Sequence, residues 1–439
     1  MLVFFFMSNS MLAQIEISGT VKDERGEPLS GATILVQATE VRTQTAADGL
    51  FNLKVADTMA VLIVSYREVA KKLIPVGNKT TFNIVLDMHE GDVDKSSGPI
   101  PADYSTVGTP KKNYAQVQVF FATDRNAITN TEPDKMFGTK RSTMSYGTCK
   151  VSIPRDHRMG ELEAPSIWSL EFKNDPEKHV TLINVEVKNK DAFFANMKTR
   201  IAKSPQKNAF LFVHGYNVSF EDAARRTAQM SYDLGFDGAP VFYSWPSQAT
   251  LAGYNVDEGN IEWSKANLKT FLEDFLTKSD AQNIYLIAHS MGNRGLTGAL
   301  ADIIRLHPEM MKRIKEVILA APDIDAAVFK RDIAPILIKG KKPITLYTSS
   351  NDVALEASQE FSNYPRAGQA GKDMIVLPGI DTIDASKVKT DFMGHSYFSD
   401  STQLLSDIFV IIHKGQRPDK RSGLKKVLKK GVPTWAFKD

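Results

Sequence analysis

One serine lies where a reactive hydroxyl would be expected. Ser290 follows an apolar, strand-like run over residues 283–289 and precedes a segment of small residues that favours a helix. A serine on so sharp a strand-to-helix turn has a strained backbone, and the small side chains of Ala288 and Gly292 leave room for the turn. The turn exposes the hydroxyl and directs the N–H of Met291 at a developing oxyanion. In the alternative interpretation, the serine only caps an ordinary helix.

A serine hydroxyl attacks a carbonyl carbon when a base removes its proton and a carboxylate orients that base. In sites built on this kind of turn, the acid and then the base follow the nucleophile along the chain. Of the eight histidines, only His395 and His413 follow the predicted strands. His413 comes after the last predicted helix in a segment rich in lysine and arginine, where a solvated role is expected. His395 lies in a loop between the last strand and the last helix, so we predict it as the general base.

Two aspartates are candidates to orient this base. Asp352 follows the predicted strand at residues 344–347, which is the usual position for the acid. Asp323 follows the preceding strand, which is an alternative position, but it could instead cap a helix that begins near Asp325. We predict Asp352 as the acid and keep Asp323 as the alternative.

A second oxyanion donor has to come from the loop after the first parallel strand. Residues 214–217 occupy this place, with Gly215 allowing the backbone to approach a substrate and the N–H of Tyr216, or of a neighbour, as the donor. We also predict His289 and Trp245 as substrate-binding residues, with core packing as the alternative for Trp245. The histidines of these two loops have no carboxylate or cysteine at ligand spacing, so the sequence predicts neither a metal site nor a cofactor.

Strands and helices alternate regularly in the second half of the chain, which is typical of a doubly wound, mostly parallel α/β sheet. Strands are predicted at residues 209–213, 240–246, 283–287, 317–321, 344–347 and 374–377. Helices are predicted at residues 220–234, capped by Ser219, and at residues 261–276 and 401–412. Antiparallel strands are expected before them, at residues 115–121, 146–154 and 179–185, and Cys149 on the second of these is expected to be a buried thiol.

Residues 15–88 are predicted to form a small all-β sandwich of seven short strands. The pattern Gly-Thr-Val-x-Asp, then Gly-x-Pro-Leu-x-Gly-Ala, then Asp-Gly-x-Phe resembles the carboxypeptidase-regulatory-like β-sandwich of exported bacterial envelope proteins. The resemblance implies a scaffold or docking module without a catalytic group. Residues 89–113 are rich in Gly, Ser, Pro, Asp and Lys and are predicted to be a linker.

The composition is that of an ordinary globular protein of 439 residues, which is long enough for two or more domains. The net charge of +3 does not point to nucleic acid as a partner. Residues 1–14 resemble a partial secretory signal, with a short apolar core and Ala13 before a plausible cleavage point. We therefore expect an exported protein of the periplasm or cell envelope, with the cytoplasm as the alternative.

The C-terminal segment 414–439 is basic, with eight Lys and Arg against one Asp in residues 414–430. Basic residues with nearby aromatic side chains could contact an anionic membrane surface. We expect instead a solvated helix that packs through its few apolar residues, so the predicted catalytic domain covers residues 114–413 and the basic segment is a separate tail.

Five segments in combination resemble a family of largely uncharacterised bacterial α/β-hydrolases: Val-His-Gly-Tyr-Asn, Phe-Tyr-Ser-Trp-Pro-Ser, Ala-His-Ser-Met-Gly, Ser-Ser-Asn-Asp-x-Ala-Leu and Gly-His-Ser-Tyr. The resemblance implies an α/β-hydrolase fold with Ser290 as nucleophile, Asp352 as acid and His395 as base. It further implies a serine hydrolase of esterase or lipase type, acting on a small-molecule or lipid ester. The alternatives are an acyltransferase, thioesterase or amidase with the same triad, or a non-catalytic envelope or glycan binding protein on this scaffold.

Overall fold

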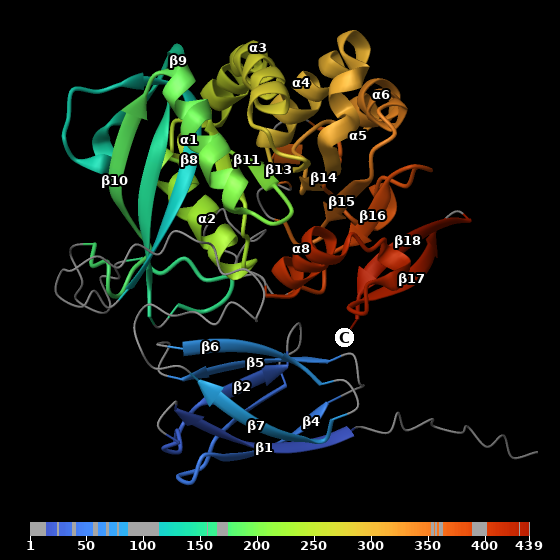
Figure 1. Cartoon of the computed structure of the whole chain (residues 1–439). Helices are drawn as coiled ribbons and strands as arrows, with labels where there is room; N and C mark the ends of the chain where they lie inside the picture. Colours follow the sequence, from blue (N-terminus) through green and yellow to red (C-terminus); the bar gives the residue numbers. More distant parts are fainter. Residues whose placement is uncertain are drawn as a thin grey trace, which may run out of the picture. The chain divides into compact units, whose positions relative to one another are not determined.

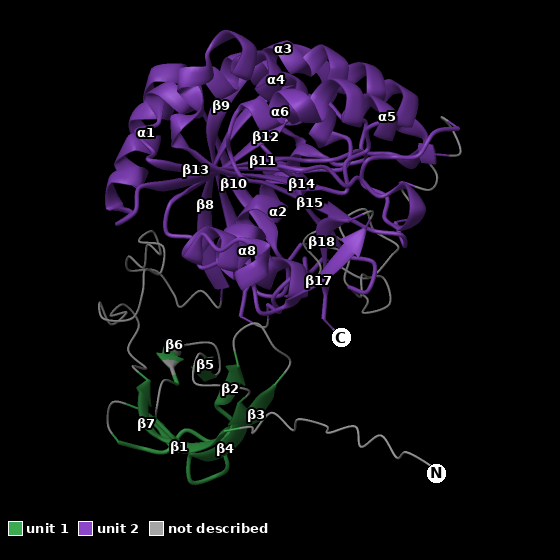
Figure 2. Cartoon of the chain, turned by 90° about the vertical axis from the view of Figure 1, so that its right-hand side faces the viewer, with its two compact units in different colours: residues 1–98 green, residues 99–439 purple. Residues whose placement is uncertain are grey.

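The computed structural model separates into two compact units, residues 1–98 and 99–439, each of which is considered by itself (Figure 1 and Figure 2). The structure describes residues 15–23, 26–36, 41–55, 60–66, 70–76, 79–86, 114–155, 157–164, 174–352, 355, 358–359, 363–388, 402–429 and 431–438. The predicted signal at residues 1–14 and the predicted linker at residues 89–113 lie outside the described residues.

The first unit confirms the predicted all-β architecture. Its strands are β1 (Ile15–Asp23), β2 (Thr33–Val36), β3 (Arg42–Gln44), β4 (Leu50–Val55), β5 (Val61–Tyr66), β6 (Ala70–Pro75) and β7 (Thr81–Leu86). They form one sheet in the order β4-β1-β7 and another in the order β3-β2-β5-β6. Buried and exposed residues alternate along β4, β5 and β7, because each sheet turns one face to a shared apolar core.

The second unit is built on one large sheet. Its strands are β8 (Tyr114–Ala127), β9 (Phe137–Pro154), β10 (Thr181–Lys188), β11 (Asn208–Val213), β12 (Ala239–Ser244), β13 (Asn283–His289), β14 (Ile314–Ala320), β15 (Ile344–Thr348), β16 (Asp381–Asp384), β17 (Leu424–Lys429) and β18 (Val432–Phe437). The order across the sheet is β10-β9-β8-β12-β11-β13-β14-β15-β16-β18-β17. The strands from β8 to β18 in this order pair in parallel, and β10, β9 and β17 are the antiparallel members.

Helices cover both faces of this sheet. They are α1 (Lys190–Lys203), α2 (Phe220–Asp233), α3 (Tyr254–Lys278), α4 (Gly292–Leu306), α5 (Ala326–Val328), α6 (Ala334–Lys339) and α8 (Thr402–Lys414). Figure 2 shows α3, α4 and α6 on one side of the sheet and α2 and α8 on the other. Apolar side chains of α1, α3, α4 and α6 pack into one core cluster, and those of α2 and α8 pack into the other. Among the described residues, no helix combines the length and the apolar character needed to cross a membrane.

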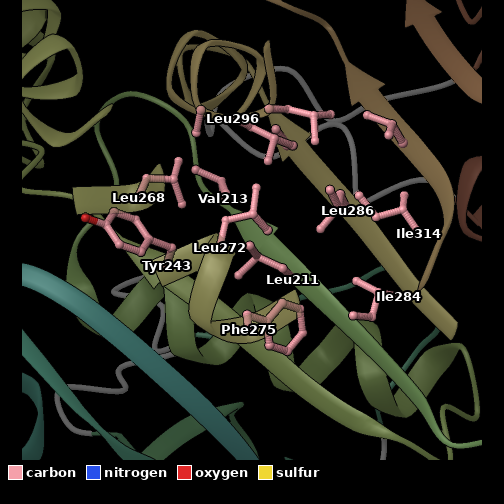
Figure 3. Packing of buried hydrophobic residues seen from close by; sticks show 14 of the residues in the cluster. Leu211, Val213, Tyr243, Leu268, Leu272, Phe275, Ile284, Leu286, Leu296 and Ile314 are labelled. Carbon is pink, nitrogen blue, oxygen red and sulfur yellow. The ribbon is translucent and has the colours of Figure 1, made fainter. Parts of the chain in front are cut away.

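The central strands are buried on both sides, as parallel strands between helical layers must be. Leu211 and Val213 of β11 point into the cluster with α3 and α4, whereas Phe210 and Phe212 point into the opposite cluster. Figure 3 shows Leu211 and Val213 among the side chains of the first cluster, which also include Leu268 and Leu272 of α3 and Leu296 of α4. These strands are therefore rigid supports for the loops that leave them.

Several features that the sequence predicts for the second unit are confirmed. The α/β-hydrolase-like alternation is confirmed, and Ser219 caps α2 in a reciprocal capping box with Asp222. Cys149 on β9 is fully buried, and burial raises the pKa of its thiol well above the usual range.

The strand predicted at residues 115–121 differs from the expected antiparallel strand. It belongs to β8, which pairs antiparallel with β9 but parallel with β12, so it begins the parallel part of the sheet.

Two predictions near the C-terminus were wrong. Residues 374–377 are not a strand, although Met374 and Ile375 are buried; the strand at this place is β16, whose Thr382 and Ile383 are buried. The basic segment is not a solvated helix, because β17 and β18 form a hairpin whose second strand pairs with β16. The segment therefore completes the sheet of the second unit instead of forming a separate tail.

Candidate functional site

The turn between β13 and α4 has the geometry that a nucleophilic serine requires. Ser290 has a φ of +49°, a left-handed conformation that is costly for a residue with a side chain. The turn is held from both sides, since the N–H of Ser290 donates to Ala320 O at 3.0 Å and its carbonyl accepts from Asp323 N at 3.2 Å. The side-chain amide of Asn293 donates to Ser290 O and Ala320 O, at 3.0 Å each. The strain is therefore supported by hydrogen bonds from the next strand.

Two glycines show how tightly this turn packs against the loop after β11. A Cβ on Gly292 would lie 2.3 Å from His214 O and 2.6 Å from Val213 O, so only glycine fits. A Cβ on Gly215 would lie 2.9 Å from Ser290 Cβ and 3.1 Å from His289 Nδ1. The structure thus brings Gly215, His289 and Ser290 together, as a site at this edge requires. Met291, the residue after the serine, is at the N-terminus of α4, where backbone N–H groups have no partner within the helix.

The loop after β11 is fixed by side chains from three other elements. Arg125 at the end of β8 donates through Nη2 to Val218 O at 2.7 Å. Ser247 accepts from Val218 N at 3.2 Å and donates to Asp257 of α3 at 2.6 Å. Asp257 also accepts from Asn217 N, at 3.4 Å, and burial raises the pKa of its carboxyl above the usual value. Tyr216 lies in this loop, and its hydroxyl donates to Leu251 O.

Trp245 supports the same loop from behind. Its side chain has no exposed surface, its Nε1 donates to His214 O at 2.8 Å, and its ring stacks on His214 with 5.1 Å between centroids. A side chain buried in this way packs in the core instead of lining a substrate pocket, so the structure favours the core-packing alternative over the predicted substrate contact.

Asp323 lies at the centre of a buried network. Its Oδ2 accepts from Tyr254 Oη at 2.8 Å and from Arg294 Nη2 at 3.2 Å. Its Oδ1 accepts from Ser358 Oγ at 2.6 Å and is paired with Arg366 Nε at 3.2 Å. Three hydrogen-bond donors and the ion pair with Arg366, whose Nε donates to Ser358 Oγ at 2.7 Å, thus occupy both carboxylate oxygens.

This network ties the serine turn to the loops of the next strands. Arg294 is on α4, and burial alone would lower its pKa, but Asp323, Tyr254 and Glu258 raise it above the usual value. Burial and the charge of Asp323 raise the pKa of Tyr254 to about 12. Asp323 does not cap the helix that follows it, which was its alternative role. The cap is Asp325, whose side chain accepts from the first N–H groups of α5.

Asp352 follows β15, as predicted, and has only 6% of its surface exposed. Its Oδ1 accepts from Leu355 N at 3.0 Å. Its loop is connected to the end of β14 through residues 366–370, because Ser349 N donates to Gly368 O and Gly368 N donates to Pro322 O, both at 2.9 Å. Asp352 lines a cavity of about 200 Å³ together with Ser349, Ser350, Gln359, Gln369, Ala370, Lys372 and Asp373.

The predicted base, His395, lies outside the described residues, which stop at residue 388 and resume with α8. Its place as the third member of the triad stays a prediction. His413, the other histidine of this region, packs on α8 against Phe409 with 4.2 Å between ring centroids. Its Nε2 donates to Leu234 O at 2.8 Å, so His413 has a structural hydrogen bond instead of the solvated role expected for it.

Comparison with known proteins identifies the second unit. Residues 189–414 match a family described as "Alpha/beta hydrolase of unknown function (DUF900)". The chain belongs to this family. Residues 17–95 match the CarboxypepD_reg-like domain, which agrees with the resemblance carried by the turn motifs of the first unit.

The similar curated proteins and solved structures cover less. Two are from Formosa agariphila: TonB-dependent receptor P3, 32% identical over 80 residues, and TonB-dependent receptor P39, 27% identical over 90 residues. These matches cover 18% and 20% of this chain, and the chain spans only 8% and 9% of the length of these receptors.

Two solved structures are distant matches. An arylesterase structure has 12% identity and a TM-score of 0.25, with 47% of this chain and 78% of that chain covered. A structure from a study of prolyl endopeptidases has 10% identity and a TM-score of 0.24, with 87% and 44% covered. Scores this low carry no argument about activity.

Three functional-site residues were not found from the sequence. Arg125, Asp257 and Tyr254 lie far from Ser290 along the chain and reach the site only through the fold. The one available signal was that Asp124 and Arg125 interrupt an apolar strand just where it ends, at the edge that carries the site.

Proposed function

We propose that the second unit is a serine hydrolase that cleaves carboxylic esters through an acyl-enzyme. The observation that carries the proposal is the left-handed backbone of Ser290, pressed against the Gly215 loop at the end of β13. Ser290 is the nucleophile, His395 the general base and Asp352 the acid that orients the base. The N–H groups of Met291 and Tyr216 stabilise the oxyanion.

In the first step, Ser290 Oγ bonds to the carbonyl carbon while its proton passes to His395. The tetrahedral intermediate then collapses, the C–O bond to the alcohol breaks, and His395 returns the proton to the leaving oxygen. Water repeats the sequence on the acyl-enzyme and releases the carboxylic acid. Esters are favoured over amides because an alkoxide leaves more readily than an amide anion.

The surroundings of Asp323 argue against it as the acid. Three hydrogen-bond donors and an ion pair with Arg366 already occupy the oxygens of Asp323. A histidine would have to displace one of these contacts before it could be oriented by Asp323. Asp352 follows β15 at the carboxyl ends of the parallel strands, where Ser290 also lies, which supports its assignment.

The test is labelling with a fluorophosphonate, which reacts with activated serines. We expect wild-type protein to be labelled and Ser290→Ala and His395→Ala to be unlabelled. Matched controls are Ser231→Ala, a buried serine of α2, and His413→Ala on α8, and both should be labelled like the wild type. Folded wild-type protein without labelling would overturn the proposal and favour a binding protein on a hydrolase scaffold.

We propose for the first unit a docking role at the cell envelope of an exported protein. Support comes from the match to the CarboxypepD_reg-like domain and from the similarity to proteins named TonB-dependent receptors. Deleting residues 15–88 should leave ester hydrolysis unchanged and release the protein from the envelope fraction. Loss of hydrolysis with unchanged location would contradict this role.

A further inference from the structure

Arg125 is a buried cation that contacts the loop after β11 and the loop after β12, near the predicted oxyanion site. It has 1% of its surface exposed, and burial lowers its pKa to about 10. Nε donates to Ser244 Oγ at 2.8 Å, and Nη2 donates to Val218 O at 2.7 Å. Nη1 donates to Gly138 O at 3.1 Å and to Ser247 O at 3.0 Å. All four acceptors are neutral oxygens; two of them, Val218 O and Ser247 O, belong to the loops that follow β11 and β12, and Ser244 is the last residue of β12.

The contacts of Ser244 continue into His214, and their direction can be assigned from chemistry. His214 Nδ1 lies 2.8 Å from Gly215 O, and a carbonyl oxygen only accepts, so Nδ1 carries the proton. His214 Nε2, 3.1 Å from Ser244 Oγ, then accepts from the serine hydroxyl. That hydroxyl oxygen in turn accepts from Arg125. Burial and the nearby charge of Arg125 hold the pKa of His214 well below its usual range, so the ring stays neutral.

The last bond of this series fixes a peptide plane. The carbonyl of Gly215 and the N–H of Tyr216 belong to one peptide unit and point in opposite directions when it is trans. A carbonyl held toward His214 therefore turns the N–H of Tyr216 away from His214. Gly215 packs directly on Ser290, because a Cβ added to Gly215 would lie 2.9 Å from Ser290 Cβ. The N–H of Tyr216 thus belongs to a peptide whose first residue packs on the nucleophile.

We propose that Arg125, Ser244 and His214 form a positioning relay that holds the Gly215–Tyr216 peptide with its N–H as an oxyanion donor. The relay rests on the proposed ester hydrolysis, to which it adds residues that do not touch the substrate. If Ser244 loses its hydroxyl, the hydrogen bond that fixes Nε2 as an acceptor is lost, and the ring of His214 is no longer held in the orientation that keeps Nδ1–H on the carbonyl of Gly215. The peptide is free to turn, and the donor is lost.

The test is Ser244→Ala, assayed with a p-nitrophenyl ester and with its thionoester. Loss of one oxyanion donor lowers kcat by about 10²-fold or more, and KM should change little. Because sulfur is a weaker acceptor than oxygen, the preference for the oxygen ester should also shrink. Ser244→Thr keeps the hydroxyl and should restore kcat and the preference. Arg125→Lys cannot replace four hydrogen bonds from three nitrogens with one ammonium group and should resemble Ser244→Ala.

The matched control is Ser152→Ala, which removes another fully buried serine hydroxyl, one bonded to His179 O on the antiparallel side of the sheet. It should keep wild-type kcat and oxygen-over-sulfur preference. A Ser244→Ala enzyme with both quantities unchanged would overturn the relay while leaving the hydrolase intact.

Nitrogen NMR of histidine-labelled full chain tests the relay even if no ester is cleaved. The relay requires the proton of His214 on Nδ1 in the wild type, and its signal is assigned by its absence in His214→Gln. A proton on Nε2 would overturn the relay. Absence of both ester cleavage and fluorophosphonate labelling would instead overturn the proposed function.

Discussion

Two buried clusters of carboxylates and cations lie at opposite ends of the parallel strands of the hydrolase sheet. Asp323, with Arg294 and Arg366, follows the carboxyl end of β14. His157, with Glu163 and Asp233, follows β9, which runs against its neighbour β8, and touches the last turn of α2. The carboxyl ends of the parallel strands therefore carry the first cluster, and their amino ends carry the second.

The two clusters have similar chemistry but different connections. Asp323 N donates to Ser290 O, so the first cluster is joined to the predicted nucleophile through the backbone. In the second, His157 Nδ1 lies 2.9 Å from Glu163 and Nε2 lies 2.8 Å from Asp233, which ties the segment after β9 to α2. Perturbed charges alone would not tell the two apart. The contact with a strained serine does.

The largest expected effect separates the two aspartates near the site. Asp352→Asn should lower kcat by about 10⁴-fold, because an amide no longer holds the base in the correct tautomer. Asp323→Asn should change the kcat of folded protein by less than roughly tenfold, since it does not orient the base. Steady-state hydrolysis of a p-nitrophenyl ester measures both variants. The reverse ranking would identify Asp323 as the acid.

The next effect is on stability. Asp323→Asn leaves two arginines without their shared carboxylate in a buried site, and breaking a buried ion pair costs about 3–5 kcal/mol. Urea denaturation of wild type and variant gives the difference in unfolding free energy. Asp332→Asn, which removes the partner of Arg331 in an exposed pair, is the control and should show no measurable change. An equally small change for Asp323→Asn would mean that the cluster does not stabilise the fold.

The second cluster should be visible as a pH dependence of stability. Burial opposes protonation of His157, but its hydrogen bonds to Asp233 and Glu163 raise its pKa from 6.5 to about 9. This stabilisation is complete below about pH 6.5 and is lost as the pH rises through 9, a difference on the order of 3 kcal/mol. Glu163, whose pKa is lowered, contributes at neutral pH and loses its contribution as the solution becomes acidic.

Urea denaturation at pH 6, 7.5 and 9.5 measures this dependence, with His157→Gln as the comparison. The variant should be less stable than the wild type at pH 6 and should lose less stability between pH 6 and 9.5. Ester hydrolysis at pH 7.5 should be unchanged while the variant is folded, because this cluster does not contact the Ser290 turn. Equal pH slopes in the two proteins would contradict the assigned charge of His157.

The sequence predicted what depends on neighbours in the chain. The strand, turn and helix around Ser290 follow from apolar periodicity and from two small residues, and α2 follows from periodicity and its cap. The all-β fold of the first unit was predicted equally well, because the turns between its strands have recognisable sequence motifs. In each case the physical cause acts within about ten residues, so the sequence records it directly.

What was missed depends on distant partners. The residues near Arg125 in the sequence do not indicate that Val218 and Ser247 accept its hydrogen bonds. The residues near Tyr254 likewise do not indicate that its hydroxyl donates to Asp323. Residues 374–377 are apolar, and Met374 and Ile375 are buried, but burial by itself does not distinguish a loop from a strand. The C-terminal lysines suggested a solvated helix, but they lie on the edge strand β17, where lysines keep other chains from pairing with the sheet.

The smallest effect compares the start and the interior of a single helix, α4. Gly292→Ala, at the start of α4, would place a methyl group 2.3 Å from His214 O, and overpacking against a backbone costs about 1–3 kcal/mol. Gly298→Ala, two turns later, meets only the flexible chain of Lys265 at 3.2 Å. Removing a glycine from a helix interior stabilises it by roughly 0.5–1 kcal/mol.

Urea denaturation and fluorophosphonate labelling of both variants decide whether this contact matters to the site. Gly292→Ala should be destabilised and labelled slowly, because the loop after β11 has to move away from Ser290 to admit the methyl group. Gly298→Ala should be more stable and labelled at the wild-type rate. If Gly292→Ala loses stability but keeps its labelling rate, the loop can shift without disturbing the oxyanion donors. The close packing of Gly292 at the carboxyl ends of the strands would then serve the fold alone, as the His157 cluster does at their amino ends.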